Sequence, residues 1–309
     1  MEHQDQQNKS YVLPIAMMFA LFFMISFVTG LQNPFGVIVK NQFMASNLES
    51  QLGNLANFIA YAFMGIPAGK MLERIGYKKT ALAAIAVGFV GVCVTFLSGT
   101  AGSFAVYLTG AFISGFSMCM LNVVVNPMLN TLGGGGKRGN QLLQFGGAIN
   151  SIGATIVPVL VGYLIGTISS ETSIANANPA LFLAMGIFAL AFIVLFSMNI
   201  PEPHAAAAVA NGVKNSHSPL SFRHFVLGAI AIFLYVGIEV GIPNIANLFM
   251  TGSTEANGLG IDTTTAGSVV GTYWFLMFIG RLTGGSLGAK FSSKGMLSFV
   301  SLLGLVFVL

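Results

Sequence analysis

The chain has 309 residues, of which 55% are hydrophobic and only 7% are charged, and its formal net charge is +4. Too few polar side chains are present to cover a water-soluble globule of this size, so the composition excludes a soluble protein and indicates an integral membrane protein. The positive charge does not indicate a nucleic-acid partner, because the basic residues stand near the ends of apolar segments, where membrane orientation explains them.

Apolar segments recur along the chain at the length that a bilayer requires, which is about 20 residues for one spanning helix. We expect spans at residues 11–38, 53–69, 80–98, 103–130, 141–167, 179–200, 225–250, 266–289 and 296–309. Many of the 38 glycines lie inside these segments, and small residues let helices pack closely in lipid. The sequence therefore predicts an all-α polytopic membrane protein.

Lysine and arginine are distributed unevenly between the predicted loops. If the N-terminus lies in the cytoplasm, the outer side receives only Lys40, and the inner side receives the basic residues at positions 9, 70–79, 137–138, 214–223 and 281–294. Basic residues collect in short cytoplasmic loops. We therefore expect a multi-pass protein of a plasma membrane, of the bacterial inner-membrane type, with a cytoplasmic N-terminus.

A polar connector divides the chain into two parts. Residues 1–200 hold six spans and should form an N-terminal six-helix bundle, and residues 201–223 should be a cytoplasmic linker. Residues 224–309 hold only three spans, and the last one offers 14 residues, which is about 21 Å of helix against a bilayer core of about 30 Å. We expect an incomplete copy of a protein with two six-span bundles, about nine spans of twelve.

The segment between the second and third spans combines an acid, several bases and a glycine that permits a turn. It reads Ile66-Pro-Ala-Gly-Lys-Met-Leu-Glu-Arg-Ile-Gly-Tyr-Lys-Lys79 and resembles the loop signature of the major facilitator superfamily, Gly-x3-Asp-Arg-x-Gly-x-Arg-Arg, with Glu73 in place of Asp. The resemblance implies a gating loop that latches neighbouring helix ends by charge. Its residues are Gly69, Glu73, Arg74, Gly76, Lys78 and Lys79. Plain anchoring by positive charge at the inner membrane surface is the alternative.

Four short segments resemble motifs of one family of sugar symporters. They are Leu121-Asn-Val-Val-Val-Asn-Pro127, Ile149-Asn-Ser-Ile-Gly-Ala154, Gly280-Arg-Leu-Thr-Gly284 and Tyr235-Val-Gly-Ile-Glu239. The first three are similar to Leu-Glu-Thr-Ala-Ala-Asn-Pro, Phe-Asn-Ser-Phe-Gly-Ala and Gly-Arg-Phe-Thr-Gly of the fucose permease family, and the fourth resembles its glucose/galactose branch. The resemblance implies a major facilitator fold with a truncated C-terminal bundle. It also implies uptake of a monosaccharide by alternating access of the bundles around a midplane cavity.

This chain departs from the family pattern at positions that couple sugar transport to a proton in the fucose permease. Where the fucose permease has one carboxylate in span one and another in span four, this chain has Asn33 and Asn122, and a neutral amide is no proton carrier. The family's Gln, three residues before the span-five Asn, is Gly147 here, with Gln144 one turn earlier. The fucose permease's coupling chemistry is therefore not transferable, and a different sugar or coupling device is implied.

Neutral amides are prominent among the polar groups inside the predicted spans. Hydroxyl-rich ligands need groups that both donate and accept hydrogen bonds, together with an aromatic face. The substrate-binding candidates are Asn33, Asn122, Asn126, Gln144, Asn150, Tyr235 and Glu239, and further candidates are Gln32, Asn54, Asn57 and Tyr61. Each amide has an alternative role, because intramembrane amides also join helices by hydrogen bonds.

Glu239 is the one acidic residue inside a predicted span. A carboxylate in hydrocarbon is costly unless it faces a wet cavity, so by default it marks an ion or substrate path. Tyr235 and Pro243 lie one turn to either side, and a break at Pro243 would free carbonyls that could coordinate an ion or sugar hydroxyls. We expect Glu239 to carry the coupled proton. The alternatives are that its ionised carboxylate binds the sugar, or that it is a paired or protonated glutamate that only packs between helices. No basic partner is expected in the membrane interior.

The function predicted is secondary transport of a glucose- or galactose-like hexose, with a proton rather than sodium as the coupling cation. Sodium coupling and uncoupled facilitation stay open. So do transport of another small solute, such as a muropeptide fragment or drug, and a sugar sensor without flux. The expected partners are the sugar, the cation and the lipid bilayer, and the expected state is a monomer. We expect no enzyme activity, cofactor or metal, because nucleophile–base sets, nucleotide loops and metal-ligand spacings are absent from the sequence.

Overall fold

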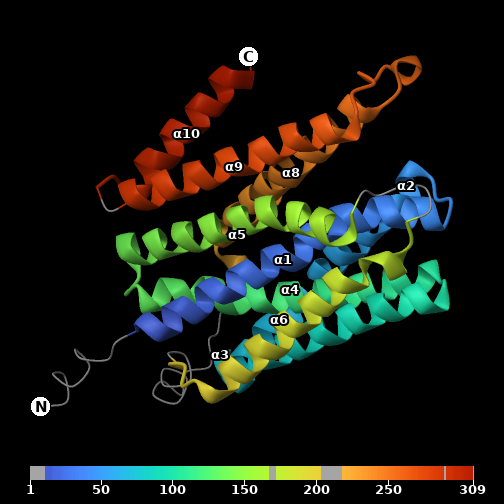
Figure 1. Ribbon diagram of the computed structural model, residues 1–309. Helices are drawn as coiled ribbons and strands as arrows, with labels where there is room; N and C mark the ends of the chain where they lie inside the picture. The colour runs from blue at the N-terminus through green and yellow to red at the C-terminus, as the bar shows by residue number, and fades with distance from the viewer. Residues whose placement is uncertain (1–10, 167–171, 203–217, 289, 309) are drawn as a thin grey trace, which may run out of the picture. The chain divides into compact units, whose positions relative to one another are not determined.

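The computed structural model describes residues 11–166, 172–202, 218–288 and 290–308, and its regular structure there is helical (Figure 1). The α-helices are α1 (Val12–Gln42), α2 (Asn47–Ser50), α3 (Leu52–Ala101), α4 (Phe104–Leu132), α5 (Gly136–Ile165), α6 (Asn178–Ser197), α8 (Arg223–Thr251), α9 (Thr263–Leu287) and α10 (Ser293–Val308). Short 3₁₀ turns occupy Ile174–Ala177, Pro219–Ser221 and Thr254–Ala256. The all-α prediction is confirmed.

Among the described residues, six helical segments are long and apolar enough to cross a membrane: α1, α3, α4, α5, Ile174–Ser197 and α8. The apolar helix at Ser293–Phe307 is shorter. The protein is therefore a multi-pass membrane protein. One of the six, α3, holds two of the predicted spans, residues 53–69 and 80–98.

The chain turns back on itself inside α3. This helix runs over 50 residues, about 75 Å if it were straight, which is more than twice the thickness of a bilayer core. Gly76 interrupts it with φ +81° and ψ 177°, a conformation that glycine adopts readily because it has no Cβ. Residues on either side of Gly76 therefore form two separate spans.

Contacts with α4 show that these two spans run in opposite directions. Before Gly76, later residues of α3 meet later residues of α4, and after Gly76 the order is reversed. The pairs are Gly53 with Tyr107 and Tyr61 with Asn122 in the first half, and Gly88 with Ser117 and Thr95 with Gly110 in the second. Both halves thus pack along α4.

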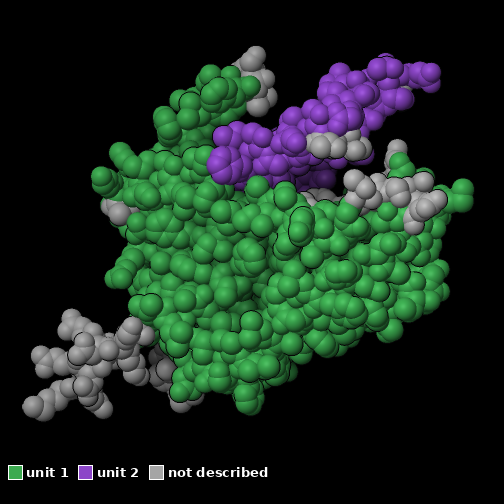
Figure 2. All heavy atoms as spheres, in the orientation of Figure 1, with its two compact units in different colours: residues 1–206, 278–309 green, residues 207–277 purple. Residues whose placement is uncertain are grey.

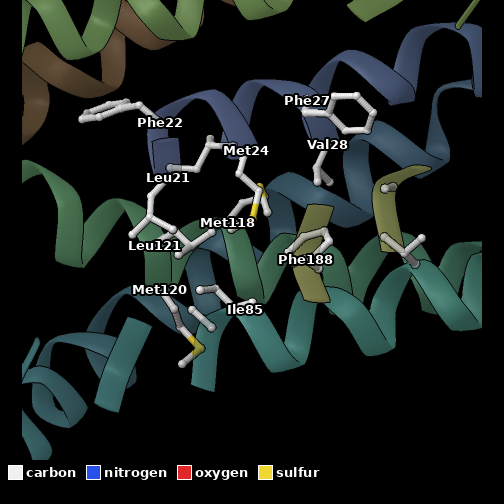
Figure 3. Packing of buried hydrophobic residues seen from close by; sticks show 14 of the residues in the cluster. Leu21, Phe22, Met24, Phe27, Val28, Ile85, Met118, Met120, Leu121 and Phe188 are labelled. Carbon is white, nitrogen blue, oxygen red and sulfur yellow. The ribbon is translucent and has the colours of Figure 1, made fainter. Parts of the chain in front are cut away.

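Buried apolar side chains from these helices meet in one core (Figure 3). Leu21 and Met24 of α1 lie beside Met118 and Leu121 of α4, and Phe188 of α6 fills the adjoining space; each is at most 2% exposed. Helix association in lipid depends on close packing more than on the removal of water. The core therefore holds the frame on which the polar side chains described below are mounted.

The chain divides into two compact units, residues 1–206 with 278–309, and residues 207–277 (Figure 2). The first unit contains α1 to α6, the end of α9 and α10, and the second contains α8 and the beginning of α9. Most of the predicted linker, residues 203–217, lies outside the described residues. The division into an N-terminal bundle, a linker and a C-terminal bundle stays a prediction.

Candidate functional site

A hydrogen-bonded chain of two amides and a phenol joins α4 to α3. The Nδ2 of Asn122 donates to the Met118 carbonyl oxygen and to Tyr61 Oη, both at 3.1 Å. The Nδ2 of Asn126 donates to the Asn122 carbonyl oxygen at 2.9 Å and to Asn122 Oδ1 at 3.3 Å. Asn126 is exposed, whereas Asn122 and Tyr61 are partly buried. The structure therefore brings together three of the residues that the sequence singled out.

The other amide candidates of this unit are more scattered. Asn150 lies on α5, and its Nδ2 donates to the Phe22 carbonyl oxygen of α1 at 3.3 Å. This is the alternative role named for each amide, a hydrogen bond that joins two helices. Gln144 is exposed on α5, two turns before Ser151. Asn33 belongs to α1 and precedes Pro34, but its side chain lies outside the described part of the structure. Asn57 is only 3% exposed and packs against Gly115 of α4.

Arg281 of α9 contacts α5 within the first unit. Its Nη1 donates to the Gly147 carbonyl oxygen at 3.0 Å and to Ser151 Oγ at 2.9 Å, and Ser151 is fully buried. These acceptors lie inside the predicted span 141–167, so Arg281 contacts a residue stretch that the sequence assigns to a membrane helix. Gly147 provides the space, because a Cβ there would lie 3.2 Å from Arg281 Cδ.

Glu239 and Tyr235 both lie on α8 in the second unit, Glu239 partly buried and Tyr235 half exposed. The break considered at Pro243 is absent, because α8 continues to Thr251 with Pro243 inside it. Proline has no N–H, so the carbonyl oxygen of Glu239, four residues earlier, lacks its helical donor. Tyr273 of α9 supplies one, with its Oη 3.1 Å from that oxygen. Sequence reasoning missed Tyr273, because the contact joins two helices and no local pattern specifies it.

The predicted gating loop meets the last turn of α6 and the residues that follow this helix, through Gly76, Tyr77 and Lys78. Glu202 Oε2 accepts from the Tyr77 N–H at 2.7 Å, and Glu202 Oε1 accepts from the Lys78 N–H at 2.8 Å. The carboxylate thus caps the helical segment that begins after Gly76, where free N–H groups favour a negative charge. A Cβ at Gly76 would lie 2.5 Å from Glu202 Oε2. The close approach therefore needs glycine.

Lys78 adds a second contact to the same helix end. Its Nζ donates to the Phe196 carbonyl oxygen at 2.8 Å and lies 5.9 Å from the centre of the Phe196 ring. Glu73, Arg74 and Lys79 are exposed, and Glu73 has no hydrogen bond or ion pair with another described residue. The carboxylate that joins the loop to a helix end is therefore Glu202, which sequence reasoning missed because it stands more than 120 residues away.

Comparisons with known proteins agree with these observations. The glucose/galactose transporter of Brucella abortus biovar 1 (strain 9-941) is 29% identical over 284 residues, which are 91% of this chain and 68% of that protein. A putative glucose/galactose transporter of Helicobacter pylori (strain ATCC 700392 / 26695) is 26% identical over 98% of this chain and 74% of its own length. The L-fucose-proton symporter of Escherichia coli (strain K12) is 21% identical over 98% of this chain and 73% of its own length.

Solved structures show the same fold. A crystal structure of the transporter FucP in the outward conformation superposes with a TM-score of 0.73 at 18% identity, covering 95% of this chain and 75% of that one. The resemblance to the fucose permease family is confirmed by these relatives. The Major Facilitator Superfamily model matches residues 18–309, nearly the whole chain. The chain therefore belongs to the Major Facilitator Superfamily of membrane transporters.

Proposed function

We propose that the protein takes up a hexose of the glucose or galactose type by alternating access, and that a proton moves with the sugar. The observation that carries the proposal is the linked set Tyr61, Asn122 and Asn126, which presents neutral donors and acceptors of the kind that sugar hydroxyls bind. The names of the relatives support the same class of substrate.

Glu239 is the proposed proton carrier. Amides stand at the two places where the fucose permease has carboxylates, Asn33 and Asn122, so coupling requires another group that can take up and release a proton. Glu239 is the acidic residue within a predicted span, and the Tyr273 contact fixes the backbone on which it stands. In this scheme, proton binding at Glu239 and sugar binding at the linked set of Tyr61, Asn122 and Asn126 favour the same change of access.

The proposed setting is a bacterial inner membrane with the N-terminus in the cytoplasm and the transporter as a monomer. The contacts of Tyr77 and Lys78 with Glu202 then lie at the cytoplasmic ends of their helices, because the surrounding segment holds four basic residues, Lys70, Arg74, Lys78 and Lys79. The loop would act there as the latch that the family resemblance implies.

Sugar counterflow in vesicles that contain the full protein tests the proposal. We expect exchange of labelled glucose or galactose, and accumulation when a proton gradient is imposed. The Glu239→Gln variant should retain exchange and lose gradient-driven accumulation. Accumulation by this variant at the wild-type level would refute the proton role, and accumulation driven only by sodium would replace the proton with sodium.

A sugar sensor without flux is the second candidate, and the amides at positions 33 and 122 are the observation that favours it. Such a protein would bind a hexose at equilibrium but show no counterflow. Saturable uptake of another solute that hexoses do not inhibit would instead indicate a non-sugar transporter.

A further inference from the structure

We propose that Tyr61 contacts the transported sugar through its hydroxyl proton, and that Asn122 positions this hydroxyl instead of binding the sugar itself. The inference rests on the proposed function and assigns separate roles to two residues of the same cluster. It predicts a ligand with acceptor oxygens and an apolar ring face, which describes a hexose.

The orientation of the Asn122 amide follows from its surroundings. Its nitrogen faces the Met118 carbonyl oxygen at 3.1 Å, and a backbone carbonyl can only accept a hydrogen bond. The nitrogen must therefore point there, and the same nitrogen lies 3.1 Å from Tyr61 Oη. Since an amide nitrogen carries two hydrogens, these two acceptors use both of them.

The Asn126 amide is oriented in the same way. Its nitrogen lies 2.9 Å from the Asn122 carbonyl oxygen, which again can only accept, and 3.3 Å from Asn122 Oδ1. Asn122 therefore donates both amide hydrogens and accepts a hydrogen bond within the bundle. A residue engaged in this way holds its neighbours in place, which is a positioning role.

The direction of the Asn122–Tyr61 hydrogen bond decides what Tyr61 can do. Because the amide donates, the Tyr61 oxygen accepts, and the phenolic hydrogen points elsewhere. It is donated to no other described residue, and a partly buried hydroxyl of tyrosine usually finds an acceptor. A carboxylate at position 122 would only accept and would take this hydrogen for itself. The amide thus makes Tyr61 available as a donor.

An aromatic surface lies beside this donor. The rings of Phe58 and Tyr61 are 6.0 Å apart and tilted by 37°, and Phe58 is 43% exposed. Pyranose rings bind through hydroxyl hydrogen bonds on their edge and through C–H groups on an aromatic face. Tyr61 and Phe58 together offer both kinds of contact, one turn apart on α3.

Equilibrium binding of labelled glucose or galactose to the purified full protein tests the assignment. Tyr61→Phe removes the donor and should weaken binding roughly 3- to 10-fold, the effect of one neutral hydrogen bond. Tyr163→Phe is the matched control, because Tyr163 is 86% exposed, and it should bind like the wild type. Unchanged affinity in Tyr61→Phe would overturn the proposal.

Asn122→Asp separates positioning from direct contact. When ionised, the new carboxylate accepts the Tyr61 hydrogen. In a Glu239→Gln background, which removes the proposed coupled proton, the affinity of the Asn122→Asp variant should fall as the pH rises, and the affinity of the protein that keeps Asn122 should not. The double variant Tyr61→Phe with Asn122→Asp should bind the sugar as tightly as the single variant with the lower affinity. If the fold-losses of the two single variants multiply in the double variant, Asn122 binds the sugar independently, which would overturn its positioning role.

Monodeoxy analogues of the bound hexose identify the acceptor. One analogue should bind the wild type more weakly than the parent hexose does, but should bind Tyr61→Phe as tightly as the parent hexose does. If every analogue is weakened equally in both proteins, Tyr61 does not contact the sugar. If one single variant does not purify as monodisperse protein, the analogue series on the other decides. A wild-type protein that binds no hexose would refute the proposed function itself. A wild-type protein that binds hexose with the same affinity as Tyr61→Phe would refute only the role given to Tyr61.

Discussion

The hydroxyl of Tyr273 donates to the carbonyl oxygen of Glu239 at 3.1 Å, and this carbonyl is the one that Pro243 leaves without a helical donor. A side chain of α9 thus repairs a defect in α8, one turn from the proline. The contact ties the backbone of the proposed proton carrier to a second helix.

Tyr273→Phe should therefore destabilise the protein, because it removes a hydrogen bond to a partly buried carbonyl. A loss of about 1–3 kcal/mol is expected, visible as a lower Tm in detergent and faster amide exchange around Glu239. Adding Pro243→Ala restores an N–H four residues after Glu239 and should recover most of the loss. A double variant as unstable as Tyr273→Phe alone would show that the hydroxyl acts in another way.

Glu202→Ala should release the segment after Gly76 from the residues that follow α6. Loss of this cap is expected to lower stability by about 0.5–2 kcal/mol and to increase tryptic cleavage at Lys78 and Lys79. Glu73→Ala is the matched control, since Glu73 is exposed, and its effect should lie within about 0.5 kcal/mol. Equal effects of the two variants would argue against a special role for Glu202.

Gly88→Ala should disturb the packing of α3 against α4 and α6. A Cβ there would lie 2.2 Å from the Phe188 ring and 2.5 Å from Ser117 Oγ, so neighbours must move, at an expected loss of about 1–3 kcal/mol. Gly186→Ala on α6 is the control, because a Cβ there meets no atom within 4 Å. Thermal unfolding of both variants in the same detergent measures the difference, and a loss no larger than that of the control would contradict the described packing.

Arg281→Met should loosen the end of α9 from α5. The pair Asn140 and Ser293, whose side chains are hydrogen-bonded at 3.2 Å, can report this when both are replaced by cysteine. Disulfide formation between them should slow several-fold in the Arg281→Met background, since charge-assisted hydrogen bonds contribute about 1.5–3 kcal/mol. Arg281→Lys should give an intermediate rate because it keeps the charge but not the planar donor group. Unchanged rates would show that Arg281 does not hold the two helices together.

Local sequence patterns predicted the helices and the turn at Gly76 well. Helix periodicity also placed Asn122 and Asn126 on one face, because residues four apart on a helix are neighbours. The contacts between distant segments were different. Glu202 with Tyr77, Tyr273 with Glu239 and Arg281 with Gly147 each depend on which helices pack together, and no local pattern specifies that choice. α8 stays helical through Pro243, as α1, α3 and α4 do through Pro34, Pro67 and Pro127, so a proline alone does not specify a break in these helices.

The contact between Arg281 and position 147 has a consequence for how that position tolerates change. The acceptor is a main-chain oxygen, which every amino acid supplies, so no particular side-chain chemistry is demanded there. Any side chain, however, would begin 3.2 Å from the arginine stem. Position 147 is therefore restricted by volume alone, and graded enlargement from Gly to Ala to Val would change the fit of α9 on α5 while leaving its hydrogen-bonding groups in place.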